Sequence, residues 1–98
     1  MPNIHNKAFI KEKLIREGYN DKMAAAVASE LVMVDRNLTP LVEKWLNNEE
    51  TIDFESHGYS ITGLMKSRGM TYPAALLTID WLIKEPETAL RSLKRGIR

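Results

Sequence analysis

The segment from Tyr72 to Lys84 places the tightest constraint on how this chain can fold. Its interior contains only two polar residues, Thr78 and Asp80. At about 100° per residue, a helix here presents one broad apolar stripe, with Leu77 and Trp81 on the opposite side. A surface helix needs only one apolar face. We therefore expect this helix either to pack between neighbouring elements or to offer Leu77 and Trp81 to another chain.

Turn and capping signals divide the rest of the chain into short helices. Gly18, Gly69 and Gly96 are placed to end helices, while Pro40 and Pro86 are placed to begin them. The expected N-caps are Asn6, Asn20 or Asp21, Thr39, Ser60 and Thr71. The expected helices span residues 6–17, 22–34, 40 to about 47, 60–68, 72–84 and 86 to about 95. The predicted fold class is all-α, a compact bundle of five to six short helices.

Two apolar stripes are expected to face the core of the N-terminal half. In the first helix the stripe comprises Phe9, Ile10, Leu14 and Ile15. In the second it comprises Met23, Val27, Leu31 and Val34. The alanines between residues 24 and 28 keep the second helix slim, which favours close helix packing. Between residues 48 and 59, Ile52 and Phe54 alternate with polar residues and allow a short extended piece.

Composition narrows the class of protein. A hydrophobic fraction of 44% with 28% charged residues is typical of a globular domain. The chain has no cysteine, signal-like segment or long apolar run, so we expect a soluble cytoplasmic protein without disulfides or membrane spans. The net charge of +1 does not favour binding to nucleic acid. The charges are unevenly distributed, however: residues 41–60 hold five acidic residues and one basic residue, and residues 61–98 hold seven basic and three acidic residues.

A common plan appears twice in the sequence. A helix, a glycine turn, an alanine-rich helix and a proline-started helix follow one another in both halves. A duplicated three-helix unit would produce this plan, and so would independent use of the same helix signals. We expect one domain over residues 1–98, with 4–48 and 58–96 as its two pseudo-repeated units.

The second of these stretches resembles the UBA-like three-helix module. The resemblance rests on Gly69-Met70 through Gly96, with Pro86, Ala89, Leu90 and Leu93 at fitting positions, and Gly18-Tyr19 through Leu46 is similar. The resemblance implies that the glycine loops and third helices form a partner surface. The residues implied are Gly18, Tyr19, Gly69, Met70 and Leu93. Glu17 and Arg68 stand where the family usually has methionine before the loop glycine.

Residues that could carry chemistry are few. His5 and His57 lack a second metal ligand at helical spacing, so we expect no metal site. Ser56 precedes His57, but neighbours in sequence rarely adopt nucleophile-and-base geometry. No phosphate loop or catalytic motif is present, and we expect neither enzymatic activity nor a cofactor. Asp80 is either a functional buried acid or an ion-pair partner of Lys84, four residues on.

The function predicted on this basis is protein–protein interaction, with a protein partner or a second copy of the chain. The predicted partner-binding residues are Tyr19, Met70, Leu77 and Trp81. The alternative is nucleic-acid binding by a basic stripe on the last helix, opposite Leu90 and Leu93. That stripe comprises Arg91, Lys94, Arg95 and Arg98.

Overall fold

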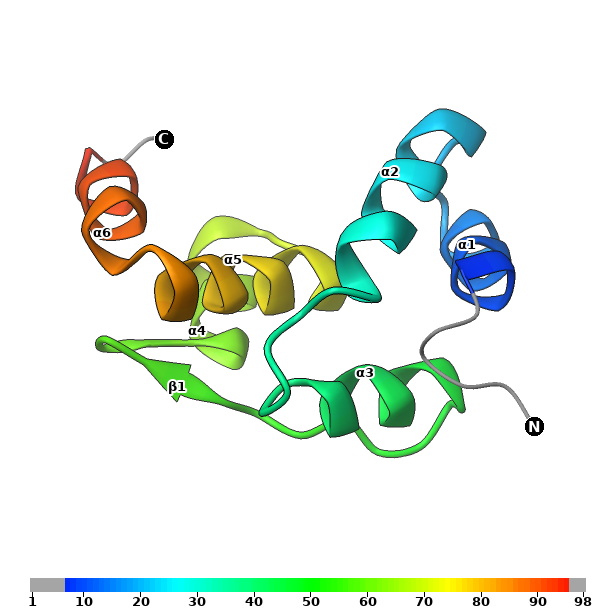
Figure 1. Cartoon of the computed structure of the whole chain (residues 1–98), viewed down its shortest axis with the longest axis horizontal. Helices are drawn as coiled ribbons and strands as arrows, with labels where there is room; N and C mark the ends of the chain where they lie inside the picture. Colours follow the sequence, from blue (N-terminus) through cyan, green and yellow to red (C-terminus); the bar gives the residue numbers. More distant parts are fainter. Residues whose placement is uncertain (1–6, 96–98) are drawn as a thin grey trace. The chain divides into compact units, whose positions relative to one another are not determined.

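The computed structural model describes residues 7–95, which form six helices and one small hairpin (Figure 1). The elements are α1 (Lys7–Arg16), α2 (Asp21–Leu31), α3 (Thr39–Leu46), β1 (Glu55–Ser56), β2 (Tyr59–Ser60), α4 (Ile61–Arg68), α5 (Tyr72–Lys84) and α6 (Pro86–Lys94). The predicted all-α fold class is therefore confirmed. The expected cap Asn6 and stop signal Gly96 lie outside the described residues.

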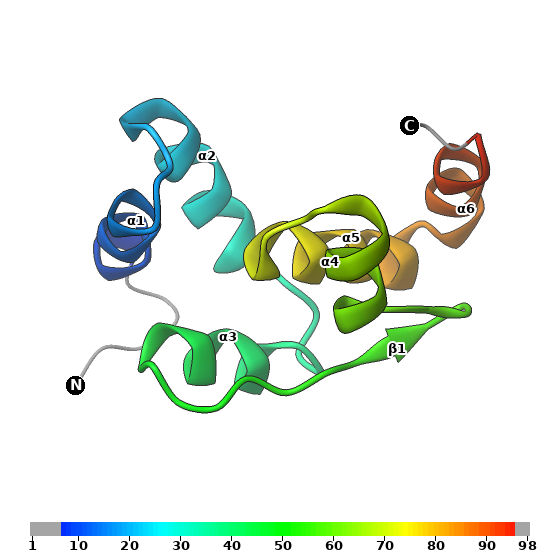
Figure 2. The same cartoon turned by 180° about the vertical axis from the view of Figure 1, so that it is seen from behind.

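The chain divides into two compact units, each with three helices. The first extends to Ile52 and contains α1, α2 and α3, and the second begins at Asp53 and contains the hairpin, α4, α5 and α6. Figure 2 shows the same elements from behind. The division between Ile52 and Asp53 falls in the segment that separates the two stretches with the same sequence plan, residues 4–48 and 58–96.

The first unit is built on α1 packed along α2. The large side chains of Ile10 and Leu14 are fully buried, as expected, whereas Phe9 and Ile15 are 44% and 42% exposed. Of the stripe predicted for α2, only Leu31 is buried: Met23 is 51% exposed, Val27 is half-buried, and Val34 lies beyond the helix, which ends at Leu31 rather than at residue 34. Small side chains take the place of Met23 against α1, since they allow the two helix backbones to approach closely. The buried residues of α2 are Ala24, Ala28 and Leu31.

Two helix ends in this unit use the same hydrogen-bonded stop. After α1, the Tyr19 N–H donates to the Leu14 carbonyl at 3.0 Å, and Gly18 has a φ of +108°. After α3, the Glu49 N–H donates to the Lys44 carbonyl at 2.8 Å. Both are Schellman motifs, which place one residue in the left-handed region. In the second motif that residue is Asn48, with a φ of +59°, where glycine would be the easier choice.

The start of α3 differs from the prediction. The helix begins at Thr39, and its N-cap is Leu38, which makes no side-chain capping bond. Thr39 therefore does not act as the cap. Pro40 does lie in the first turn, as expected, because its missing N–H needs no partner there. Leu38 is fully buried, so packing rather than a capping hydroxyl fixes this helix start.

Lys13 is a buried cation in the first unit, with 6% of its surface exposed. Its Nζ lies 2.7 Å from Asn48 Oδ1, 3.2 Å from Glu17 Oε2 and 5.0 Å from the centroid of the Trp45 ring. A buried ammonium is costly unless hydrogen-bonded and paired. Asn48 thus supplies both the left-handed backbone position that ends α3 and an acceptor for this charge.

The second unit opens with a two-residue hairpin turn. Glu55 pairs with Ser60 and Ser56 with Tyr59 in antiparallel register. His57 and Gly58 occupy the turn with φ values of +52° and +85°, the signature of a type I′ turn. The extended piece anticipated around residues 52–54 therefore forms slightly later in the chain.

The N-terminus of α4 is capped from two directions. The Ser60 hydroxyl accepts the Gly63 N–H at 2.9 Å, as predicted for this cap. In addition, Asp53 Oδ1 accepts the Thr62 N–H at 3.0 Å and the Phe54 N–H at 2.9 Å. A Cβ at Gly63 would lie 2.8 Å from the Ser60 hydroxyl oxygen. Glycine at this position thus leaves room for the cap.

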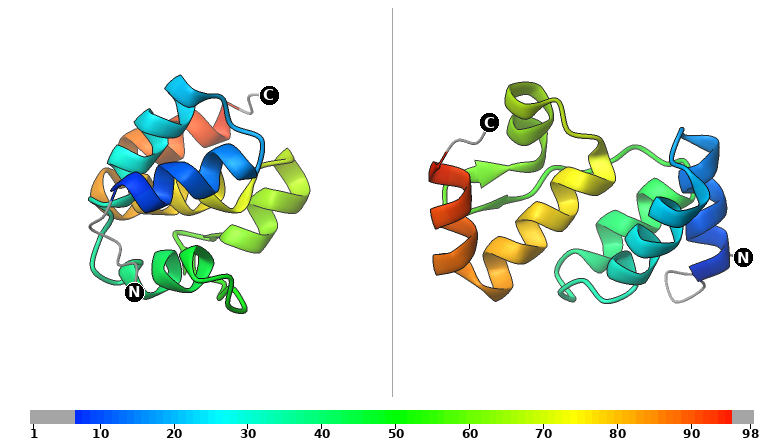
Figure 3. Two further views of the ribbon diagram at one scale, coloured as in Figure 1. Left: turned by 90° about the vertical axis from the view of Figure 1, so that its right-hand side faces the viewer. Right: turned by 90° about the horizontal axis from the view of Figure 1, so that it is seen from above.

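Within the second unit α5 occupies the central position. It contacts α4, α6 and both strands of the hairpin (Figure 3). Its N-cap is Thr71, whose hydroxyl accepts the Ala74 N–H, as predicted. One side of the helix is buried, in agreement with the predicted apolar stripe. The buried residues are Pro73, Ala75, Leu76, Ile79, Asp80 and Leu82.

We predict that the stability effect of Asn48→Gly depends on Lys13. In the natural background the substitution removes an acceptor from a buried ammonium and should lower the free energy of unfolding by about 1–3 kcal/mol. In a Lys13→Met background it should be neutral or stabilising, because glycine suits the left-handed backbone better. Urea unfolding of the four proteins measures the coupling. Equal effects in both backgrounds would contradict this assignment.

A second prediction concerns pH. Partial desolvation of the Asp53 carboxyl raises its pKa, but hydrogen bonds from Thr62, Phe54 and Ile61 outweigh this and leave the pKa below its ordinary value. The carboxylate therefore contributes stability above the unfolded-state pKa, and the contribution is lost as the pH falls through the folded pKa. Asp53→Asn should weaken protection of the Thr62 amide against hydrogen exchange at neutral pH. The difference from the natural protein should shrink in acid, as followed by NMR.

Candidate functional site: the outer face of α5

The half-buried side of α5 gathers most of the predicted partner-binding residues. We call it the α5 outer face, and it comprises Met70, Ala74, Leu77, Thr78 and Trp81, all half-buried. The Thr78 hydroxyl lies 2.9 Å from the Ala74 carbonyl oxygen and 3.7 Å from Met70 Sδ. These contacts place the Met70 side chain against the helix, on the side that carries Leu77 and Trp81. Three of the four predicted residues thus belong to one surface.

Trp81 is anchored at the C-terminal end of this face. Its indole Nε1–H donates to Glu85 Oε1 at 3.2 Å. Glu85 is also the only residue between α5 and α6, and has a φ of −139° and a ψ of 69°. The indole is thereby held in one orientation with its polar edge paired and its apolar ring partly open to solvent. Helical periodicity predicts the side of α5 on which Trp81 lies, but not this bond.

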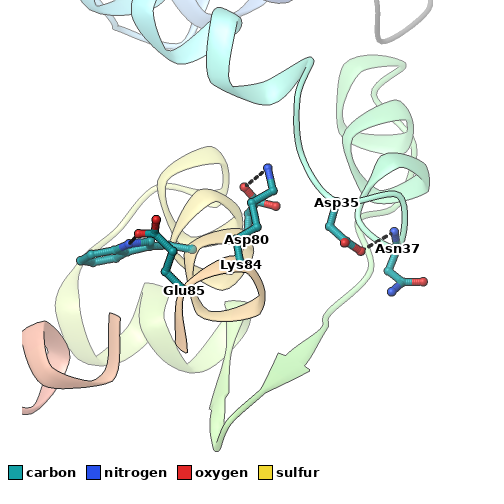
Figure 4. A network of polar contacts seen from close by, with 6 residues as sticks. Asp35, Asn37, Asp80, Lys84 and Glu85 are labelled. Carbon is teal, nitrogen blue, oxygen red and sulfur yellow. Dashed lines mark hydrogen bonds and ion pairs between the residues drawn. The ribbon is translucent and has the colours of Figure 1, made fainter. Parts of the chain in front are cut away.

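Asp80 forms the ion pair with Lys84 that was one of the two alternatives considered for it. Its Oδ2 lies 3.1 Å from Lys84 Nζ, one turn along α5 (Figure 4). The two side chains differ in environment, since 46% of the Lys84 side chain is exposed and only 11% of that of Asp80. Asp80 is thus more deeply buried than a residue at the helix margin. The pair satisfies a carboxylate that would otherwise be costly to bury.

The remaining predicted partner-binding residue, Tyr19, belongs to the first unit. It is half-buried and follows Gly18 in the motif that ends α1. Among the residues that the UBA-like resemblance implied, Leu93 is buried at 7% exposure. Gly69 ends α4 with a φ of +67°, as its sequence position predicted.

Arg68, at the position where the UBA-like resemblance implied a methionine, has a structural partner. Its Nη2 donates to the Leu93 carbonyl oxygen in the last turn of α6 at 3.1 Å. Carbonyls in the last turn of a helix are the ones open to donors from outside the helix. Arg68 therefore caps α6 from α4, a contact that sequence spacing alone did not reveal.

The basic residues of the last helix lie on its exposed side. Arg91, Lys94 and Arg95 are exposed, and Ala89 and Leu93 are the buried residues of α6. Arg98, the fourth member of the predicted stripe, lies outside the described residues. No ion pair joins the three described cations to another residue in the range 7–95.

Ser56 and His57 are closer than their positions in sequence suggested. The Ser56 hydroxyl oxygen lies 2.8 Å from His57 Nδ1, within hydrogen-bond reach. This one distance does not establish a nucleophile-and-base pair, and His57 itself lies in the left-handed region of the hairpin turn, with a φ of +52°. The ring is exposed at the hairpin tip. Across residues 7–95, no three carboxylate or histidine side chains are grouped to hold a metal ion, and His5 lies outside this range.

Comparison of the chain with protein-family models, curated proteins and solved structures gave no match. None of the helices within residues 7–95 has both the length and the hydropathy to cross a membrane.

We predict that Arg68→Gln loosens the end of α6. Loss of a hydrogen bond from a charged donor should destabilise the last turn by about 1 kcal/mol, and so speed amide exchange there roughly fivefold. NMR-detected exchange of the α6 amides measures the effect. Lys66→Gln is the matched control, since Lys66 lies in the same turn of α4 but makes no such bond with a described residue. Equal exchange in both variants would show that the Arg68 contact contributes nothing.

Proposed function

We propose that this chain is a small non-enzymatic protein-interaction domain that binds through the α5 outer face. The observation that carries the proposal is the partial exposure of Trp81 and Leu77 one turn apart on α5, next to Met70. Tryptophan is enriched among residues that dominate binding energy, and methionine adapts its shape to a partner. The outer face thus combines a fixed aromatic ring with a flexible apolar neighbour.

The packing of the second unit supports this assignment. The opposite side of α5 already supplies large buried side chains to the core, including Leu76, Ile79 and Leu82. Leu77 and Trp81 are left half-buried by the chain itself. Burying the rest of these two side chains would release further hydrophobic free energy, at about 25 cal/mol per Å² of apolar surface. Association with another chain provides that burial.

The occupant that we propose is a second copy of this chain. In a twofold dimer the same apolar patch meets itself, so a face with a central apolar pair is self-complementary. Antiparallel packing of two α5 helices would also bring Glu85 of each copy to the N-terminal end of the other helix. An anion is favourable there because of the helix dipole. A different protein with an apolar helix is the other occupant that the experiment distinguishes.

Leu77→Glu should abolish association, because it places a charge in the centre of the proposed interface. Sedimentation equilibrium of the natural chain should give a mass above the monomer that falls on dilution, and the variant should remain monomeric. Trp81→Ala should weaken association by at least tenfold, in line with the cost of removing a central anchor, more than about 1.4 kcal/mol. Circular dichroism and thermal unfolding establish that both variants are folded.

Met33→Glu is the matched control. Met33 is 72% exposed and lies in the first unit, outside the α5 outer face, so its substitution should leave the mass unchanged. A natural chain that stays monomeric at every concentration contradicts the dimer.

Photo-cross-linking from position 77 in cells that produce the chain then decides whether the α5 outer face binds any protein. A defined adduct lost in Trp81→Ala identifies a different protein as occupant, and no adduct overturns the interaction function.

A further inference from the structure

A second surface of the same unit carries cations from two helices. Arg68 reaches from the end of α4 to the Leu93 carbonyl oxygen, 3.1 Å away. This bond places its guanidinium at the end of α6, beside the exposed residues Lys94 and Arg95, with Arg91 one turn earlier. We call Arg68, Arg91, Lys94 and Arg95 the α4–α6 basic surface.

The charges on this surface are not neutralised within the described part of the chain. Several other cations have acidic partners, as Lys11 has in Asp21, Lys44 in Glu49 and Lys84 in Asp80. None of the four members of the basic surface forms an ion pair with a residue in the range 7–95. One of the five N–H donors of Arg68 is used by Leu93, which leaves others for a ligand.

The net charge of +1 is a sum over the whole chain and does not describe the field beside these four cations. The last helix itself carries one acidic residue, Glu87, against Arg91 and Lys94. Cations are also favourable near helix C-termini, and among the described residues Arg68 hydrogen-bonds a carbonyl in the last turn of α6.

We propose that the α4–α6 basic surface binds the phosphate backbone of a nucleic acid, as an activity separate from the α5 outer face. Three of its four cations are arginines, whose planar guanidinium groups match phosphate oxygens with two hydrogen bonds. An interface with an acidic protein would in addition need an apolar centre. Within residues 53–95 no large apolar side chain is exposed, so the second unit itself offers no such centre beside these cations.

Salt dependence of DNA binding provides the test. The full chain is titrated into a fluorescently labelled duplex of mixed sequence, and anisotropy is followed at several salt concentrations. We expect binding that weakens steeply with salt, with a slope of log affinity against log salt of about −3 to −4 for four phosphate contacts. Arg91→Gln, Lys94→Gln and Arg95→Gln should each reduce the magnitude of that slope by about 1, without sequence preference.

Lys66→Gln and Lys22→Gln are matched controls. Both residues are exposed cations that form no ion pair with a described residue. Lys66 lies two residues before Arg68, about 200° around α4, and Lys22 belongs to the first unit. Neither substitution should change the slope as much as those on the basic surface. Circular dichroism confirms that α6 remains helical in each variant.

Several outcomes would overturn the proposal. No binding at low salt rejects it, and so does a loss in the control variants equal to that at Arg91, Lys94 and Arg95. Tighter binding of poly-glutamate than of DNA in the same assay identifies an acidic polypeptide as the ligand instead. Leu77→Glu should leave DNA binding intact, so this proposal and the one for the α5 outer face can fail independently.

Discussion

Helices of eight to thirteen residues, the lengths found here, are marginal in water when isolated. Each therefore depends on packing and on hydrogen bonds that satisfy its free ends. The chain meets this constraint with side chains drawn from other segments as well as with local caps. Asp53 binds the start of α4 from beyond the hairpin, and Arg68 binds the end of α6 from α4. Asn48 ends α3 while holding the buried ammonium of Lys13. The same bonds that stabilise the helices thus fix how they pack within each unit.

Several helix boundaries could be predicted from sequence because their signals are local, although the cap of α3 and the end of α2 were not. Gly18, Gly69, Ser60 and Thr71 act at the positions that their side chains and backbone preferences indicate. The identity of the core side chains was harder to predict. Met23 is the larger apolar residue, yet Ala24 and Ala28 are the buried ones, because the distance between two helix axes is set by both partners. The type I′ turn was missed because one of its left-handed positions is His57 rather than the usual asparagine, aspartate or glycine.

For the two proposed binding surfaces as well, contacts within one helix could be predicted from sequence, whereas contacts between segments could not. Helical periodicity placed Leu77 and Trp81 on one side of α5, and the ion pair of Asp80 with Lys84 followed from their spacing. Periodicity could not reveal that Met70 joins this face, since its contact with Thr78 crosses a turn. Nor could periodicity predict the contact of Arg68 with α6. The acceptor is a backbone carbonyl oxygen, which every residue has, so the identity of the side chain at position 93 gives no signal. Contacts of this kind between residues far apart in the chain cannot be recognised from the spacing or type of the residues.

Glu85 links the α5 outer face to the α4–α6 basic surface. It is the single residue joining α5 to α6, and its carboxylate holds the indole N–H of Trp81. A chain that binds over Trp81 and draws the indole away from Glu85 would change the free energy of the junction that carries the cations of α6. A polyanion bound to those cations would act on the same junction from the other side. Thermodynamic linkage would make such effects equal in both directions, while a partner that leaves the bond between Trp81 and Glu85 intact would bind independently of the cations.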